Sequence, residues 1–388
     1  MKIFHLSDLH IGKQLHLYDM SDVQRRVLKE IVACAKENRP DAILISGDIY
    51  DKSAPSGDAF MIFDEFLNDI SSLEPKIPVL IISGNHDSNQ RLSYASSFMN
   101  KHNIYIAAMP PQNEADKLKK IVLNDEYGSV NFYMLPFVRV ADAKNLFGDT
   151  KEIRTYDDAV AAILEREAID YSQRNVLLAH QFFVSGSDTP KRCDSEVNYI
   201  SVGGIDSVDI RHVSDFDYVA LGHIHTSQKV GEGKIRYCGS PIKYSVSEAN
   251  GDKSITVVNL GPKDSELSID TIPLIMKPDI KVLKGTLDEV IAMSNEELKN
   301  DFVSIVLTDR AGLFRPKDRL RDFYNNILEI CIEGRGDSIL KSEESDDFFD
   351  RDILTMFCDF YEEMNKEPIG EEEKNVISEV IADCMDNM

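Results

Sequence analysis

Five apolar segments of this chain end in the same way, with Asp, Asn or His following shortly afterwards and often after a glycine. The segments are 3–6, 42–46, 78–83, 175–179 and 217–221, and each is short and mostly apolar, which predicts buried strands. In an open α/β sheet, ligands bind beyond the carboxyl ends of the strands. We therefore expect these polar side chains to meet at one place in the fold.

The residues that follow the predicted strands are types that bind metal ions. Any one of them alone would be interpreted as a hydrogen-bonded loop residue, but their repetition at five strand ends favours a common site. Five of the nine histidines belong to this set. The set is Asp8, His10, Asp48, Asn85, His86, His180, His223 and His225.

Mixed oxygen and nitrogen ligands suit manganese, iron or zinc. Two metal ions about 3.5–4 Å apart stabilise both the attacking and the leaving oxygen of a phosphoryl transfer. Asp48, directly after Gly47, is the natural candidate for the carboxylate that bridges them. One imidazole must stay uncoordinated to protonate the leaving oxygen, and His86 is placed for that role. Asp87 is interpreted either as the acceptor that orients His86 or as a helix N-cap.

Residues 1–275 are predicted to form one α/β domain, because strands alternate with helices of apolar spacing. The expected helices are 22–34, 59–70, 91–100 and 157–169, and the last strands are 235–238, 254–260 and 267–272. A smaller α/β module is predicted at 276–340. Its expected strands are 280–283, 302–307 and 327–332. Two helices are expected in this module. The first begins at a capping box formed by Thr286 and Glu289, and the second is 316–326.

Residues 341–388 are predicted to form a pair of acidic amphipathic helices. From Lys341 onward the chain has 16 acidic and 4 basic residues, which is half of the net charge of −24. Two such helices expose too much apolar surface to stand alone. They either pack on the chain's own core or dock a partner helix or coiled coil.

The net charge of −24 argues against a protein that holds nucleic acid by charge alone. The six cysteines form no Cys-x-x-Cys pair, which fits reduced thiols and argues against a zinc ribbon. No run of about 18 apolar residues is present, and the chain opens on a strand without a signal peptide. We expect a cytoplasmic protein with no membrane contact.

The strand-end motifs, taken together, resemble those of the calcineurin-like metallophosphoesterases. They are Asp8-x-His10, Gly47-Asp48-x-x-Asp51, Gly84-Asn85-His86-Asp87, His180 and Gly222-His223-x-His225, in that order. More narrowly, Ser7–Lys13 and Gly239–Ser245 are similar to the SbcD family, the nuclease subunits that work with SbcC. The resemblance covers essentially the whole chain. It implies a metallophosphoesterase β-sandwich flanked by helices, a small α/β capping domain at 276–340, and a helical pair at 341–388 that docks SbcC.

The resemblance also implies how the candidate ligands divide between two divalent ions. One ion would be held by Asp8, His10, Asp48 and His225. The other would be held by Asp48, Asn85, His180 and His223. His86 would stabilise the transition state or act as the acid. Manganese, Mn(2+), is the favoured ion of the family, and Mg, Fe or Zn are further possibilities.

The activity implied by the resemblance is metal-dependent cleavage of DNA in repair, recombination and replication. It would be a 3′→5′ exonuclease on duplex ends and an endonuclease on hairpins or single strands, working with the ATPase SbcC, whose coiled coil it would bind. Helices 59–70 and 91–100 would form a homodimer within an SbcC2–SbcD2 heterotetramer. Two alternatives are a phosphatase or small-molecule phosphodiesterase, and a mainly structural subunit that tethers DNA ends.

Asp51 is a departure from part of the wider family, because archaeal and eukaryotic relatives have a second histidine shortly after the Gly-Asp motif. This argues against a scheme with two free histidines and fits the bacterial branch. Supporting or substrate-contacting roles are expected for Asp87, Asp51, Lys13 and Arg91. Further cations near the motifs, each an ordinary surface residue if taken alone, are Arg25, Arg26, Lys52, Arg139, Lys191 and Arg192.

Overall fold

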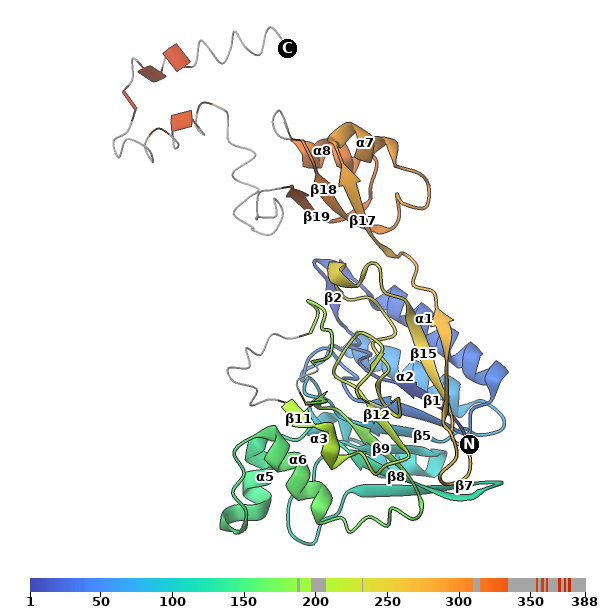
Figure 1. Cartoon of the computed structure of the whole chain (residues 1–388). Helices are drawn as coiled ribbons and strands as arrows, with labels where there is room; N and C mark the ends of the chain where they lie inside the picture. The colour runs from blue at the N-terminus through green and yellow to red at the C-terminus, as the bar shows by residue number, and fades with distance from the viewer. Residues whose placement is uncertain are drawn as a thin grey trace. The chain divides into compact units, whose positions relative to one another are not determined.

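The computed structural model describes residues 1–186, 189–196, 207–231, 233–309 and 315–333, and some positions between 354 and 377. It divides the chain into two compact units, Met1–Asp279 and Ile280–Met388 (Figure 1). The helices predicted at 341–388 lie almost wholly outside the described residues, so neither interpretation of what they pack against is tested.

The first unit contains two six-stranded mixed sheets. In each sheet four parallel strands lie next to antiparallel strands at the edge. In spatial order the first sheet is β16 (Ser268–Leu274), β15 (Lys253–Asn259), β1 (Lys2–Leu6), β4 (Ala42–Ser46), β5 (Val79–Ile82) and β6 (Ile104–Ala107). The second is β13 (Gln228–Lys229), β14 (Ile235–Tyr237), β12 (Tyr218–Leu221), β9 (Arg174–Ala179), β8 (Gly128–Leu135) and β7 (Lys119–Asp125).

The two sheets pack face to face around a shared apolar core. Leu44 and Leu80 of the first sheet belong to the same buried cluster as Phe132 and Val176 of the second. A direct hydrogen bond, 2.9 Å long, also joins the sheets, from the Ser46 hydroxyl on β4 to the Ala220 carbonyl on β12. The predicted α/β class and the β-sandwich implied by the resemblance are therefore confirmed.

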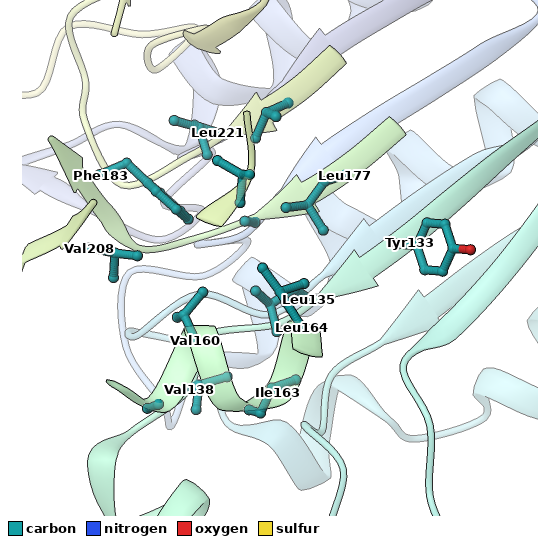
Figure 2. Close-up of a cluster of buried hydrophobic side chains, with 14 of the residues drawn as sticks. Tyr133, Leu135, Val138, Val160, Ile163, Leu164, Leu177, Phe183, Val208 and Leu221 are labelled. Atoms are coloured by element: carbon teal, nitrogen blue, oxygen red, sulfur yellow. The ribbon is translucent and has the colours of Figure 1, made fainter. Parts of the chain in front are cut away.

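Helices cover the outer surfaces of the sandwich. Val160 and Ile163 of α6 (Tyr156–Glu165) pack with Leu177 and Leu221 of the second sheet (Figure 2). Beside the first sheet lie α1 (Ser21–Asn38) and α2 (Gly57–Ser71) (Figure 1). Further elements of this unit are β2 (Gln14–Leu15), β3 (Tyr18–Asp19), α5 (Val140–Phe147), β10 (Phe182–Val184) and β11 (Ser207–Asp209), with short 3-10 turns between elements.

The prediction of a single helix at 91–100 is wrong. The structure has two one-turn helices, α3 (Asn89–Leu92) and α4 (Ser96–Met99), followed by a 3-10 turn at Asn100–His102. Ala95 between them has a positive φ of 58°, which ends helical pairing. The segment is rich in serine, and Ser93 donates to the Asn89 carbonyl at 2.6 Å, the kind of local bond that competes with a longer helix.

The second unit has a three-stranded parallel sheet in the order β17 (Ile280–Gly285), β18 (Phe302–Leu307) and β19 (Asn326–Ile332). The predicted capping box is confirmed, since Thr286 and Glu289 bond reciprocally at the start of α7 (Leu287–Ala292). The helix predicted at 316–326 is shorter in the structure, where α8 is Pro316–Arg321. The backbone nitrogen of Asn325 donates to the Lys299 carbonyl instead of continuing the helix. None of the described helices has the length and apolar character that a bilayer crossing requires.

A buried ion pair joins β9 to β7 within the second sheet, and its arginine also reaches the segment that follows β15 of the first sheet. Arg174, 3% exposed, binds both carboxylate oxygens of Asp125, at 2.6 and 3.0 Å. It also donates to the carbonyls of Gly128 and Gly261, at 2.7 and 3.1 Å. The guanidinium holds the pKa of Asp125 well below its usual range. A bidentate pair of this kind positions both strands that it touches.

Asp125→Asn should therefore lower the free energy of unfolding by about 3 kcal/mol at pH 7, because it leaves a buried guanidinium without its anion. The pair stabilises the fold fully above about pH 4, the pKa of Asp in an unfolded chain, and its contribution falls as pH drops further. Urea unfolding at several pH values measures this. The exposed control Asp252→Asn should change little, and an equal loss at pH 3 and pH 7 would contradict the assignment.

Candidate metal centre

Asp48 lies at the middle of the candidate site, beyond the carboxyl end of β4. Its Oδ2 atom is 3.5 Å from Nε2 of His10, 3.4 Å from Nε2 of His180 and 4.0 Å from Nε2 of His86. These three imidazoles follow β1, β9 and β5, so both sheets contribute to the site. The carboxylate is only 2% exposed.

On one side of Asp48, the side chains of Asp8, His10 and His225 come together. Each offers one ligand atom, and these atoms all lie within 4.8 Å of one another. The Nε2 atoms of His10 and His225 are 3.0 Å apart. All three side chains are buried.

On the other side of Asp48, Asn85 lies between two histidines. Its Oδ1 atom is 3.1 Å from Nε2 of His180 and 3.0 Å from Nδ1 of His223. Here Asn85, His223 and the nearby His86 are half-buried, whereas the side with Asp8 and His10 is closed. The structure thus brings all eight residues of the strand-end set together, and solvent reaches them from the Asn85 side.

The turns that deliver these side chains have an unusual backbone. The φ angles of Asp8, His10, Asp48 and His223 are 53°, 41°, 50° and 95°. Residues other than glycine rarely adopt positive φ, although Asp and His tolerate it better than most, and each instance costs on the order of 1 kcal/mol or more. Backbone hydrogen bonds 3.0 Å long, from Asp8 N to Gly47 O and from His10 N to Asp48 O, lock the first two turns together.

Two glycines allow the strand ends to approach closely. A Cβ atom on Gly84 would collide with the carboxylate and backbone nitrogen of Asp48. A Cβ atom on Gly222 would collide with the Ser46 carbonyl and the His180 ring. The glycine in each motif is therefore required by the space between neighbouring turns.

The two buried carboxylates differ in their affinity for protons. Burial raises the pKa of Asp8 to about 6, and Asp48 adds to this rise while His180 opposes it. Burial also disfavours ionised Asp48, but His180, His10 and His86 outweigh it and hold the pKa of Asp48 well below its usual range. Asp48 therefore favours the anionic form at neutral pH, which is the form in which a carboxylate binds a metal ion.

The imidazoles of the site also differ in their affinity for protons. Burial lowers the pKa of His223 to about 3 and holds the pKa values of His10 and His225 well below normal. Burial acts on His180 in the same direction, but Asp48 and Asp8 outweigh it and raise the pKa of His180 to about 9. The carboxylates thus favour positive charge at this position, and a bound cation would take the place of that proton.

Hydrogen bonds on the far side of two rings fix which nitrogen faces the site. Nδ1 of His180 lies 2.7 Å from the Ser46 carbonyl, so it donates there and leaves Nε2 of the neutral ring free to bind a metal. Nδ1 of His225 lies 2.8 Å from the Ser195 hydroxyl, which donates to Glu248 at 2.6 Å. Both rings therefore present an Nε2 lone pair to the centre of the site.

Sequence reasoning missed the residues that support the ligands. Glu248 is 3% exposed and also pairs with Lys253 at 2.5 Å. Gln24, a fully buried polar residue of α1, donates to the His10 carbonyl at 2.9 Å and accepts from Gly12 at 3.0 Å. A polar residue on the apolar face of a predicted helix was the signal for Gln24. Ser195 and Glu248 had no comparable signal.

Both interpretations of Asp87 are wrong. Ser88 caps α3, and Nδ1 of His86 is 2.7 Å from the Asp51 carbonyl, not paired with the Asp87 carboxylate. The carboxylate of Asp87 instead accepts from three backbone nitrogens, at 2.9–3.1 Å. They belong to Gly84, Ile49 and Tyr50. Asp87 therefore fixes the turn after β5 against the turn after β4.

The other supporting candidates are near the site but differ in their partners. The Lys13 ammonium is 3.1 Å from Oδ1 of Asp51, which in turn lies 3.7 Å from Nδ1 of His10. Arg91 donates to the Ser53 carbonyl at 2.5 Å, next to the Asp51 turn. Asp51 thus neutralises a cation close to the His10 side of the site.

The donor set fits divalent metal ions. Carboxylate oxygens, one amide oxygen and imidazole nitrogens converge from five turns, and Asp48 contributes to two candidate clusters, one with His10 and His86 and one with Asp8 and His180. Mixed oxygen and nitrogen donors of this kind suit Mn, Fe or Zn. His86 belongs to neither of the ligand groups expected from the sequence, although in the structure its ring also lies within reach of a metal ion bound by His10 and Asp48.

Comparisons with known proteins agree with this geometry. A family model described as calcineurin-like phosphoesterase matches residues 1–227, and one described as type 5 capsule protein repressor C-terminal domain matches residues 277–365. The chain is 30% identical to the SbcD subunit of the SbcCD nuclease of Staphylococcus epidermidis, over 100% of this chain and 99% of that protein. It is 28% identical to the same subunit from Staphylococcus saprophyticus, over 98% of each. This chain belongs to the SbcD family of calcineurin-like phosphoesterases.

Family membership identifies the chain as a hydrolase of the phosphoesterase type. Among solved structures, a dimetal phosphatase from Danio rerio matches 71% of this chain and 99% of its own, with a TM-score of 0.39 and 11% identity. A likeness this weak gives no information about the substrate. The substrate class is inferred below from the site and from the SbcD relatives.

Gly84→Ala should expel metal from the site, because its methyl group would occupy the space of the Asp48 carboxylate. We expect the number of divalent metal ions bound per chain to fall and phosphoesterase activity to drop at least tenfold, a loss of about 1.4 kcal/mol in transition-state stabilisation. Metal analysis after gel filtration measures the first effect. The control Gly57→Ala meets nothing within 4 Å and should behave like the wild type; full metal content in Gly84→Ala would contradict the packing argument.

Proposed function

We propose that this chain is a two-metal phosphodiesterase that cuts DNA as the nuclease subunit of an SbcCD-type complex. One observation carries the proposal. Asp48 and six further candidate ligands gather at one point, and the eighth residue of the set, His86, lies on the side that solvent reaches, with its Nε2 atom 4.0 Å from the Asp48 carboxylate. The names of the curated relatives support a nuclease over another phosphoesterase.

Metal ions bound by the two ligand groups would polarise the phosphate and lower the pKa of an attacking water. We propose Asp8, His10, Asp48 and His225 for one ion and Asp48, Asn85, His180 and His223 for the other. Mn²⁺ is the proposed ion, with Mg, Fe or Zn as the alternatives that the donor types allow.

The proposed role of His86 is to hold a proton at Nε2 and deliver it to the leaving oxygen. Its Nδ1 atom donates to the Asp51 carbonyl at 2.7 Å, which fixes the ring and directs Nε2 toward the site. The ring is half-buried on the side that solvent reaches, as a group that meets substrate must be. Protonation is needed because an alkoxide is a poor leaving group.

The test is a cleavage assay of the purified chain with Mn²⁺ and then with chelator. The substrates are an end-labelled duplex, a hairpin and a phosphomonoester. We expect chelator-sensitive cutting of DNA, by 3′→5′ exonuclease and hairpin endonuclease activity, with little turnover of the monoester. Rapid turnover of the monoester with intact DNA would replace the proposal with a phosphatase.

His86→Ala should retain both metals and DNA affinity but lose about 10²- to 10⁴-fold in kcat, the usual contribution of a general acid. The exposed control His102→Ala should cleave at the wild-type rate. Single-turnover cleavage, with metal content measured on the same samples, checks this. Normal cleavage by His86→Ala would show that the His86 side chain takes no part in the mechanism.

The proposed partners are a second copy of the chain and an SbcC-type ATPase, in an SbcC2–SbcD2 complex. Large apolar side chains are exposed on α2 and α4, where Met61 and Phe98 are 55% and 64% exposed, and Tyr94 between α3 and α4 is 82% exposed. These residues form the proposed homodimer face. Functions in DNA repair, recombination and replication, and a cytoplasmic location, remain predictions from the family.

The acidic helices predicted at 341–388 are the proposed docking segment for the coiled coil of SbcC. Deleting residues 345–388 should abolish co-purification with SbcC but leave metal-dependent cleavage by the isolated chain within about twofold, because every candidate ligand precedes residue 226. Retention of the ATPase by the truncated chain would contradict this docking role.

A further inference from the structure

Two arginines at the edge of the candidate metal centre hold their guanidinium groups over phenylalanine rings. The Cζ atom of Arg192 is 3.8 Å from the centre of the Phe182 ring, a distance typical of flat stacking. The Cζ atom of Arg139 is 5.8 Å from the centre of the Phe137 ring. In the described part of the chain, neither guanidinium pairs with a carboxylate.

The two phenylalanines connect these arginines to the ligand histidines. The Phe182 and His223 ring centres are 6.4 Å apart, those of His223 and His180 are 5.3 Å apart, and those of His180 and Phe137 are 6.4 Å apart. The rings therefore form a continuous row with a guanidinium at each end. In order, the row is Arg192, Phe182, His223, His180, Phe137 and Arg139.

The segment that carries Arg192 is anchored to its surroundings. The side chain of Gln228 bonds both the nitrogen and the oxygen of the Lys191 backbone, at 2.9 and 2.8 Å. On the other side of Arg192, the Asp194 nitrogen donates to Ser247 at 3.0 Å. Arg192 is thus held beside the site before any ligand arrives.

Two other cations near the motifs are already paired with carboxylates. Arg25 pairs with Asp58 and Glu65, at 2.5 and 3.3 Å, and Lys13 pairs with Asp51 at 3.1 Å. Arg192 and Arg139 differ from these two in that their guanidinium groups have a phenylalanine ring, not a carboxylate, as the neighbour that the described residues provide. A guanidinium that stacks by its face leaves the N–H groups at its edge directed outward, where they match the two oxygens of a phosphate.

We infer that Arg192, with Arg139 as a second contact, binds backbone phosphates of the DNA strand that extends past the His180–His223 side of the site. This inference rests on the proposed nuclease function. The ligand residues would surround the reacting phosphate, and each arginine is separated from the nearest ligand histidine by a phenylalanine ring, so the arginines serve the neighbouring phosphates. The half-buried Asn85 and His223 lie on this same accessible side.

The test is DNA binding by the full chain in chelator, where no cleavage occurs, across a series of salt concentrations. Arg192→Gln should weaken duplex binding roughly tenfold at low salt, as expected when one charge-assisted hydrogen bond is removed. The slope of log affinity against log salt should become less steep by about 0.9 for each phosphate that is no longer neutralised, and Arg139→Gln should add to the effect. The control Lys191→Gln removes the same charge from the adjacent residue and should change the slope far less.

Three results would contradict the phosphate-binding role of Arg192, and they can be told apart. Equal slopes for Arg192→Gln and Lys191→Gln would overturn the inference even if the wild type cuts DNA. Equal losses of kcat/KM on DNA and on a small phosphodiester, which has no neighbouring phosphate, would also overturn it, because Arg192 would then act on the reacting group. If the wild type neither binds nor cuts DNA, the proposed function itself fails, and the inference fails with it.

Discussion

The Asp48 carboxylate occupies the point where turns from both sheets of the sandwich meet, and the rest of the site depends on its burial there. Its Oδ1 atom accepts from the His86 backbone nitrogen at 2.9 Å, and its Oδ2 atom faces the imidazoles of His10 and His180. A buried anion requires compensating charge. The surrounding imidazoles supply part of it, and a bound cation would supply the rest.

Gathering these groups costs conformational energy that the sandwich must offset. Four candidate ligands have positive φ, and Gly84 and Gly222 are needed because no side chain fits where the turns approach. The supporting groups, Asp87 between two turns and Gln24 beneath His10, use buried hydrogen bonds to hold this geometry. Strain of this kind persists where the surrounding structure over-determines it, and such positions cluster at functional sites.

Much of the site was predictable because it depends on local sequence. A short apolar strand followed by glycine and a polar residue can be recognised without knowing what it packs against, and five such endings named all eight residues of the set. Prediction failed where several weak local preferences compete. The segment 91–100 has apolar spacing, but its serines form local bonds that break the helix, and no element was predicted between 101 and 156, where β6, β7, β8 and α5 lie.

The sequence by itself determined the α/β class, the order of the strands that end in ligands, and the identity of the candidate ligands, because these depend on spacing along the chain. Only the tertiary structure decided which atoms meet. It showed that Asp87 joins two turns, that Ser195 and Glu248 orient His225, and that Arg192 stacks on Phe182 beside His223. These contacts join residues distant in sequence or depend on how loops fold over one another, and no periodicity or motif spacing encodes such distances.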